Sequence, residues 1–256
     1  MSIPNKAVAL IDATRRSSGS ASANAEFDLL RNPIFNSLLT DHQALAIGDE
    51  RAKRFPAEIG PLGGMVDQSP ASFDALSRIA GPGGVLALFL PAPPAPPAGW
   101  TLLRGGLLSQ MVCSNPQIDE QPAKSVDSVF RKLTAENVLA MLALAELTEP
   151  GPFRQRTIEL GNFWGVLESG RLLAMAGERL SLPHFIEVSA VCTHPSARGR
   201  GYARSLMSTV MADIHAQGKT PFLHVFADNH SAIRVYQSLG FTLHQTFHLA
   251  VLKNAD

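Results

Sequence analysis

One short stretch carries the clearest chemical signal in the sequence. It consists of Arg198, Gly199, Arg200, Gly201, Tyr202 and Ala203. An apolar run precedes it and an amphipathic run follows it, which predicts a strand, a tight turn and a helix. Glycines let a bulky anion approach the backbone, and the free N–H groups at the start of a helix attract negative charge. The stretch therefore predicts a phosphate-binding turn, with a diphosphate as its natural occupant.

Two common phosphate motifs are absent from the sequence. There is no GxxxxGKS or GxxxxGKT pattern, which argues against a P-loop NTPase. Gly201 is followed by Tyr202, Ala203 and Arg204, so the third glycine of the dinucleotide fingerprint GxGxxG is missing. From these residues alone, a glycine-rich turn that binds nothing and a phosphate-binding α/β domain of another kind both remain open.

The composition narrows the class of protein and its partners. The 256 residues carry no formal net charge, whereas proteins that bind nucleic-acid backbones usually have an excess of Lys and Arg. Cys113 and Cys192 form no CxxC pair, which excludes a disulfide scaffold or a zinc ribbon. His244 and His248 lie in a strand-like segment with no third ligand, so they predict no metal site. No apolar run reaches the ~20 residues of a membrane span. We expect a cytoplasmic protein with no nucleic-acid or membrane partner, and a homo-oligomer remains open.

The chain is expected to contain a leader and two domains. Residues 1–25 read as an irregular leader, with a transit peptide as the alternative. An N-terminal α/β domain over 26–120 and a C-terminal domain over 124–256 follow, and the polar stretch from Ser114 to Ser125 marks the boundary. Pro91 to Trp100 predicts a stiff loop between two strands, with a proline-rich recognition ligand as the alternative.

Hydrophobic periodicity predicts the elements of each half. The first half has helical spacing over Glu26 to Ala46, a loop over Glu58 to Ser69, a helix over Ser72 to Ala80, and strands over Val85 to Leu90 and Trp100 to Val112. In the second half we expect strands over Val126 to Leu133, Asn162 to Glu168, Arg171 to Glu178, from His184, over Phe222 to Phe226 and over Phe241 to Lys253, with helices after Thr134, from Ala203 and over Ser231 to Leu239. This order predicts a mixed α/β fold whose strands before and after the turn are parallel neighbours.

Two motifs in this order resemble a known family. The stretch from Arg198 to Ala203 matches the signature Q/R-x-x-G-x-G/A of the GNAT superfamily of acyl-CoA-dependent N-acyltransferases. Asn229 to Tyr236, followed by Leu239-Gly240-Phe241, is similar to the next motif of that family, N-x-x-A-x-x-x-Y with a terminal GF. The run SAVCTHPSARGRGYA also resembles the branch that includes glycine N-acyltransferase-like proteins. The resemblance extends from about Lys124 to the C-terminus. It implies a twisted central sheet flanked by helices in that half, with the N-terminal half as a degenerate copy of the same fold.

The resemblance implies roles for particular residues. The diphosphate of acetyl-CoA would bind the amides of the turn from Arg198 to Ala203, and its pantetheine arm would run beside Val191, Cys192 and Thr193. Asn229 and Ala232 belong to the same cofactor site, where Asn229 hydrogen-bonds the cofactor or braces the neighbouring loop. Tyr236 occupies the position of the general acid that protonates the departing thiolate, a role that suits a phenol with a pKa near ~10.

The proton acceptor is expected to be Glu187. It lies eleven residues before Arg198, where some members of the family carry a catalytic glutamate, and it shares a strand face with Ser189. Other members carry the glutamate at the position of Ser189, and a water chain is an alternative base. An ion-paired or surface glutamate is the structural alternative. The histidines His184, His194, His224 and His230 are expected to be structural, although His184 or His224 could line the acceptor pocket.

The resulting functional prediction is an N-acetyltransferase. It would transfer the acetyl group of acetyl-CoA directly to a primary amine of a small molecule or peptide, without a metal. The alternative is a non-catalytic acyl-CoA-binding or scaffold protein. The loops around Leu147 to Phe153 and Leu180 to Phe185 are expected to recognise the acceptor, and Glu149 either attracts its amine or is a solvated surface residue.

Overall fold

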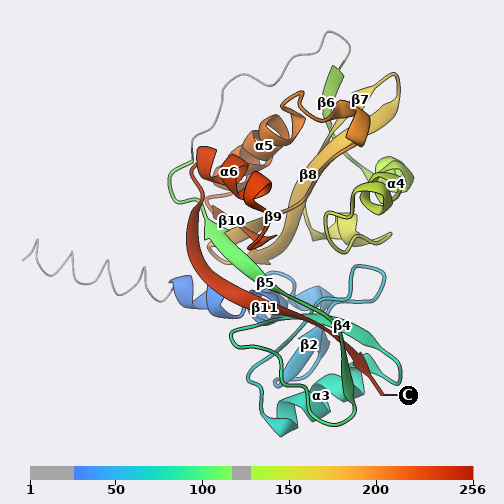
Figure 1. Cartoon of the computed structure of the whole chain (residues 1–256), viewed down its shortest axis with the longest axis vertical. Coiled ribbons are helices and arrows are strands. Elements are labelled where there is room, and N and C mark those ends of the chain that lie inside the picture. The colour runs from blue at the N-terminus through green and yellow to red at the C-terminus, as the bar shows by residue number, and fades with distance from the viewer. Residues whose placement is uncertain (1–25, 117–127, 256) are drawn as a thin grey trace, which may run out of the picture.

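Two lobes share one long sheet. A computed structural model describes residues 26–116 and 128–255, and the expected leader over 1–25 lies outside this part. The N-terminal elements form the lower lobe in Figure 1, the C-terminal elements form the upper lobe, and two long strands run through both. The fold is mixed α/β, as expected.

Within the described residues the main sheet has eight strands. Across the sheet they are β4 (Val85–Leu90), β11 (Thr242–Asn254), β5 (Trp100–Val112), β10 (Thr220–Phe226), β9 (Phe185–Thr193), β8 (Arg171–Leu182), β7 (Phe163–Glu168) and β6 (Ser128–Lys132). A smaller sheet holds β1 (Ile47–Gly48), β2 (Ala52–Arg54) and β3 (Gly63–Met65). The helices are α2 (Pro33–Leu39), α3 (Pro70–Ala80), α4 (Val138–Thr148), α5 (Tyr202–Ala216) and α6 (His230–Ser238). None of them combines the length and hydrophobicity that a membrane crossing requires.

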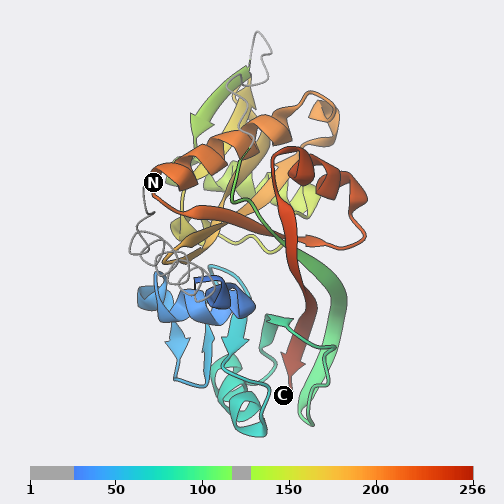
Figure 2. The same ribbon diagram turned by 90° about the vertical axis from the view of Figure 1, so that its left-hand side faces the viewer.

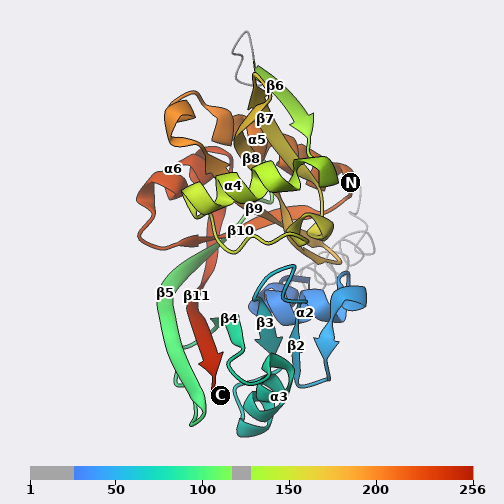
Figure 3. The same cartoon turned by 90° about the vertical axis from the view of Figure 1, so that its right-hand side faces the viewer.

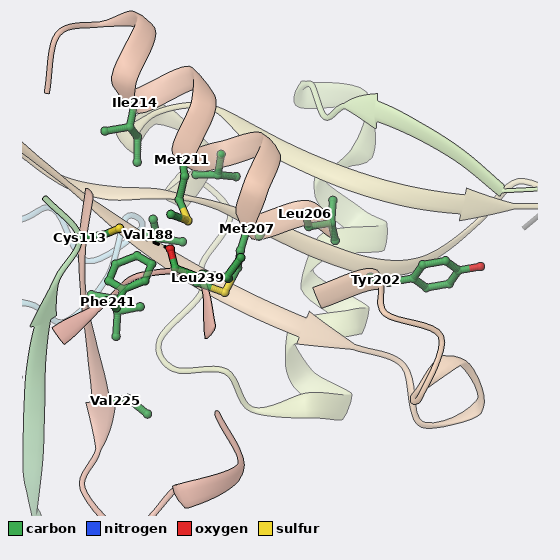
Figure 4. Packing of buried hydrophobic residues seen from close by; sticks show 14 of the residues in the cluster. Cys113, Val188, Tyr202, Leu206, Met207, Met211, Ile214, Val225, Leu239 and Phe241 are labelled. Atoms are coloured by element: carbon green, nitrogen blue, oxygen red, sulfur yellow. Dashed lines mark hydrogen bonds between the residues drawn. The ribbon is translucent and has the colours of Figure 1, made fainter. Parts of the chain in front are cut away.

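Helices cover both faces of the upper part of the sheet. Helices α5 and α6 lie on one face, with α5 in front in Figure 2, and α4 lies on the opposite face in Figure 3. The apolar face of α5 is fully buried, and Figure 4 shows Met207 and Met211 pointing towards Val188, Leu239 and Phe241. Since each such side chain contributes about 1.5–3 kcal/mol when buried, this contact fixes the helix on the sheet.

The element that positions the predicted site is the unit β9–α5–β10. Strands β9 and β10 are parallel neighbours, as expected, but they pair only from Phe185 with Thr220 to Glu187 with Phe222. Beyond these pairs the two strands separate. The opening between them therefore begins directly after Glu187.

The N-terminal half repeats the order of the C-terminal half. Each half has a helix, three antiparallel strands, a helix, a strand and a final long strand: α2, β1–β3, α3, β4 and β5 in one, and α4, β7–β9, α5, β10 and β11 in the other. In the N-terminal half the counterpart of the β9–β10 pairing is a single parallel bridge between Leu62 and Ala87. This arrangement agrees with the expected degenerate copy.

The two halves exchange their final strands. Strand β5 of the N-terminal half pairs with β10 of the C-terminal half, and β11 lies between β4 and β5. The sheet is therefore continuous across the expected domain boundary. The division into domains over 26–120 and 124–256 stays a prediction, because residues 117–127 lie outside the described part.

Two N-terminal segments differ from the expectation. The expected loop over Glu58 to Ser69 contains the short strand β3, which packs so tightly that a Cβ on Gly64 would lie 2.8 Å from Phe35. The expected helical run over Glu26 to Ala46 is split into α2 and short 3-10 turns. Pro33 explains the break before α2, because a proline disfavours helical backbone in the residue that precedes it.

Candidate active site

The predicted phosphate-binding turn is open and leads into an uncapped helix. Gly199 and Gly201 both have φ of +79°, a left-handed conformation that glycine adopts without strain. A Cβ built on Gly199 would meet no atom within 4 Å, so there is room in front of the turn. No side chain caps the first turn of α5. The helix therefore presents N–H donors to the solvent, which fits the diphosphate of a nucleotide-type cofactor.

The equivalent helix of the N-terminal half is closed by its own side chains. The Ser69 hydroxyl accepts the backbone N–H of Ser72, and Pro70, the first helical residue, has no N–H to offer. The Asp67 carboxylate accepts the backbone N–H of Ser69 at 2.9 Å and the hydroxyl of Ser72 at 2.6 Å. These hydrogen bonds lower the pKa of Asp67 to about 2 and keep it anionic. The negative charge of Asp67 thus lies at the N-terminus of α3, whereas the N-terminus of α5 is left open.

The side chains of the turn support its shape more than they add charge. Arg200 forms an ion pair with Glu168 at 3.1 Å, and the buried Tyr202 donates its hydroxyl to the same carboxylate at 2.5 Å. Arg198 is exposed. The backbone N–H of Arg198 donates to the carbonyl oxygen of Pro195 at 3.4 Å. The other backbone amides of the turn, together with the Arg198 side chain, are therefore the groups left to bind an anion.

A β-bulge lies on β9 beside the opening between the strands. Ser189 pairs with Gly177 and Cys192 pairs with Met175, so β9 carries one extra residue, and Ala190 has a φ of +53°. Such bulges redirect backbone groups next to functional sites. Cys192 is buried, and burial raises the pKa of its thiol to about 11, so the thiol stays protonated. The predicted roles of Val191, Cys192 and Thr193 as a backbone edge for pantetheine remain predictions.

Helix α6 brings the second motif to the same side of the sheet as α5. The Asn229 side chain accepts the backbone N–H of Ala232 at 3.2 Å, so it caps α6 and braces the loop before it. Tyr236 is half-buried and its ring packs against Phe241. Burial raises the pKa of Tyr236 to about 12, so its phenol is a proton donor at neutral pH.

Glu187 has partners that the sequence did not predict. Its carboxylate accepts two hydrogen bonds from Arg179, from Nε at 2.7 Å and from Nη2 at 2.6 Å, and lies 2.7 Å from Nδ1 of His224. Burial alone would raise the pKa of Glu187, but Arg179 and then His224 outweigh it and lower that pKa to about 2. The arrangement is the ion-paired alternative, and the expected role of Glu187 as proton acceptor stays a prediction.

A chain of buried polar side chains continues from this ion pair. Gln110 on β5 places its Nε2 at 3.1 Å from both Nε2 of His224 and the carbonyl oxygen of Leu30. Burial lowers the pKa of His224, which keeps it neutral. This network of hydrogen bonds thus links β8, β9 and β10 to the N-terminal half, at the place where β9 and β10 separate. Glu187 and His224 were visible in the sequence as candidate site residues, whereas their partners Arg179 and Gln110 were not.

Two cavities have Arg104 of β5 as a common lining residue. The first, which we call the α4-side cavity, has a volume of about 780 Å³ and lies between α4, the loop after it and Arg104 of β5. The second has about 660 Å³ and lies between Arg104 and the segment from Phe226 to His230. The loop residue Phe153 lines both the α4-side cavity and a small void of about 10 Å³ at Ser189 and Ala190. The loop that carries Phe153 therefore lies between the α4-side cavity and the β-bulge. No cluster of three or more potential metal ligands occurs in 26–116 and 128–255.

Comparisons with known proteins identify the class. Residues 164–249 match a family described as FR47-like protein. The crystal structure of a putative acetyltransferase of the GNAT family from Novosphingobium aromaticivorans is similar, with a TM-score of 0.80 and 36% identity, covering 89% of this chain and 99% of that one. A GCN5-related N-acetyltransferase from Kribbella flavida shares the fold at 17% identity, with a TM-score of 0.58 and coverage of 86% and 95% of the two chains.

Curated relatives match a part of this chain. Mycothiol acetyltransferases from Streptomyces scabiei and Amycolatopsis mediterranei are 34% and 32% identical over 116 and 117 residues, or 41% and 44% of this chain. The matched segment spans 37% of the length of each of these relatives. The 36% identity over nearly the full length of the Novosphingobium structure shows the family of this chain. The chain belongs to the GNAT family, whose acetyltransferases use acetyl-CoA as co-substrate. The narrower resemblance to glycine N-acyltransferase-like proteins stays a prediction.

Proposed function

We propose that the chain is an N-acetyltransferase that transfers the acetyl group of acetyl-CoA directly to a primary amine. The observation that carries this proposal is the contrast between two equivalent helices. Helix α5 leaves its first N–H groups uncapped beside an opening in the sheet, whereas α3 covers its own with Asp67 and Ser69. A cofactor with a diphosphate explains why only one of the two repeats is kept open.

The proposed catalytic roles rest on the resemblance of the two motifs to those of the GNAT family. Acetyl-CoA supplies the thioester. The amides from Arg198 to Ala203 bind its diphosphate, and a backbone N–H near Val191, beside the bulge, polarises its carbonyl group. Tyr236 donates the proton that leaves with the thiolate, and its raised pKa keeps that proton in place until then. Holding the donor and the amine in one cleft contributes further, because it removes the entropy of a bimolecular encounter.

The acceptor amine must lose a proton, and the candidates to take it are Glu187 and water. A carboxylate with a pKa of about 2 that already accepts hydrogen bonds from Arg179 and His224 is a weak base at neutral pH. We therefore propose that Glu187 holds the strands at the opening and that the proton passes to water in the cleft, the alternative base that the sequence left open.

The direct test measures cofactor binding and turnover separately. CoA should raise the melting temperature of the protein, and primary amines should accelerate the release of free CoA from acetyl-CoA. Binding without stimulation by any amine would favour the second candidate, a non-catalytic acyl-CoA-binding protein, to which the full pairing of Glu187 also lends support. An unchanged melting temperature with CoA would contradict both candidates.

The acceptor substrate named for the curated relatives is not assigned to this protein. These relatives are named mycothiol acetyltransferases, but the segment that matches this chain is only 37% of their length. We propose a small-molecule or peptide amine, from the resemblance of the sequence, and a cytoplasmic location, from its composition.

A further inference from the structure

The α4-side cavity has charges of both signs on its walls. Glu146 lies on α4, and Glu149 follows directly at its C-terminal end. Arg154 lies on the loop after the helix, and Arg104 lies on the opposite wall, on the strand β5 that the N-terminal half contributes. All four residues are exposed. The cavity is thus lined by two carboxylates and two guanidinium groups.

These charges do not neutralise one another. Within the described residues, no ion pair joins any two of the four, although Arg78, Arg156 and Arg179 each have a carboxylate partner within 4 Å. Opposite charges that face one space without pairing leave their hydrogen-bonding groups available to a ligand. A ligand that carries both an ammonium and a carboxylate would satisfy both walls at once.

Two features give Arg104 a defined place. Its guanidinium lies over the ring of Phe226, 5.3 Å from the ring centroid, which holds the side chain at the end of β10. A Cβ on Gly106 would lie 2.8 Å from the same ring, so the absence of a side chain there lets Phe226 lie flat against β5. Arg104 also borders both cavities. A held guanidinium with no acidic partner is suited to bind a planar carboxylate through two parallel hydrogen bonds.

The other end of the cavity is built differently. Glu149 ends α4 with φ of +47°, a left-handed conformation that is uncommon for a residue other than glycine. This conformation ends the helix, and the backbone N–H of Glu149 donates to the carbonyl oxygen of Ala145 at 2.8 Å, which fixes the position of the residue at the edge of the cavity. Together with Glu146, this carboxylate gives the α4 wall a negative charge that attracts a protonated amine.

We propose that the acceptor is an amine that also carries a carboxylate, of the amino-acid or peptide class, and that Arg104 binds this carboxylate. The proposal rests on the proposed acetyltransferase function and adds the acceptor class to it. A purely cationic polyamine would leave Arg104 and Arg154 unmatched, and a purely anionic ligand would be repelled by Glu146 and Glu149. The N-terminal half would thereby supply a residue that determines specificity.

The test compares matched acceptors on matched variants. Free L-amino acids and their α-amides share the amine and the side chain but differ in the carboxylate. Arg104→Gln should lower kcat/KM for the amino acids by about 10- to 100-fold, the usual effect of losing one charge-assisted hydrogen-bonded contact, and should leave the amides within about twofold. Arg131→Gln, an exposed arginine on β6 with four strands between it and β5, is the control and should change neither.

Binding measurements separate this proposal from the proposed function. The same pairs are titrated by calorimetry into the CoA-loaded protein and into its Arg104→Gln variant. If Arg104→Gln lowers the acetylation of amides and of amino acids equally, the proposed acceptor class is wrong, although the proposed acetyltransferase function is retained. If no amine is acetylated, the proposed function fails, and the titration still decides the role of Arg104: amino acids that bind no better than their amides would refute it.

Discussion

Replacing Glu187 by glutamine tests how the structure uses its buried carboxylate. The Glu187 side chain is fully buried, and that of Arg179 is 12% exposed. The difference between the ordinary glutamate pKa of 4.5 and the value of about 2 corresponds to about 3 kcal/mol, because each pKa unit equals about 1.4 kcal/mol. Removing one partner of a buried ion pair typically costs about 3–5 kcal/mol. We therefore expect Glu187→Gln to lower the free energy of unfolding at pH 7 by about 3 kcal/mol.

The pH dependence of this loss has a defined sign. A carboxylate whose pKa is lowered in the folded state contributes stability that is complete above its unfolded pKa and is lost as the pH falls. The contribution of Glu187 should be complete above its ordinary pKa of 4.5 and should disappear as the pH falls towards about 2. Denaturant unfolding of the wild type and of Glu187→Gln should therefore converge over this interval.

A surface ion pair supplies the control for Glu187. Glu159 pairs with Arg156 at 2.7 Å, but both side chains are more than 40% exposed. Glu159→Gln should cost less than about 1 kcal/mol, as exposed pairs usually do. The interpretation would be refuted if Glu187→Gln were as stable as the wild type at pH 7 yet lost the alkaline rise of its pH–rate curve. That result would assign the carboxylate to proton transfer.

Two further variants test the cofactor site and the acid. Gly199→Ala should raise the KM for acetyl-CoA and cost about 1–2 kcal/mol of stability, because its φ of +79° disfavours a side chain; Gly60→Ala, where there is also room for a Cβ, is the control, and equal effects at both sites would contradict the phosphate-binding role. Tyr236→Phe should lower kcat by about 10²- to 10⁴-fold with little change in cofactor affinity, and turnover near the wild-type rate would remove Tyr236 from the proton-transfer step.

The sequence predicts the local part of the site well. The turn, the amphipathic helix after it and the strands on either side follow from spacing within about 40 residues, and the structure contains all of them. Between β7 and β8 the structure has a two-residue turn, in which Ser169 and Gly170 both adopt the positive φ that such a turn requires.

The parts that sequence reasoning missed depend on contacts between distant strands. Arg179, Glu187 and His224 lie on three strands, and only the sheet order brings them together. The sequence around Glu187 does not show the residues that neutralise its charge. From the sequence alone, the carboxylate is therefore interpreted as a reactive group. Likewise, the short strand β3 is held by pairing with β2 and by the close approach of Phe35, which no periodicity records.

The exchange of the final strands has a consequence for protein synthesis. Strand β10, which forms one side of the cleft, has β5 as its partner beyond Phe222, while β4 pairs with β11, which is synthesised after both of them. The N-terminal half therefore emerges with β4 and β5 lacking the strand that lies between them. Unpaired strand edges associate readily with other chains, and sheets built from distant segments form slowly. The edges of β4 and β5 must thus stay protected until β11 has been synthesised. The sheet of both lobes is completed in one step, when β11 pairs between β4 and β5.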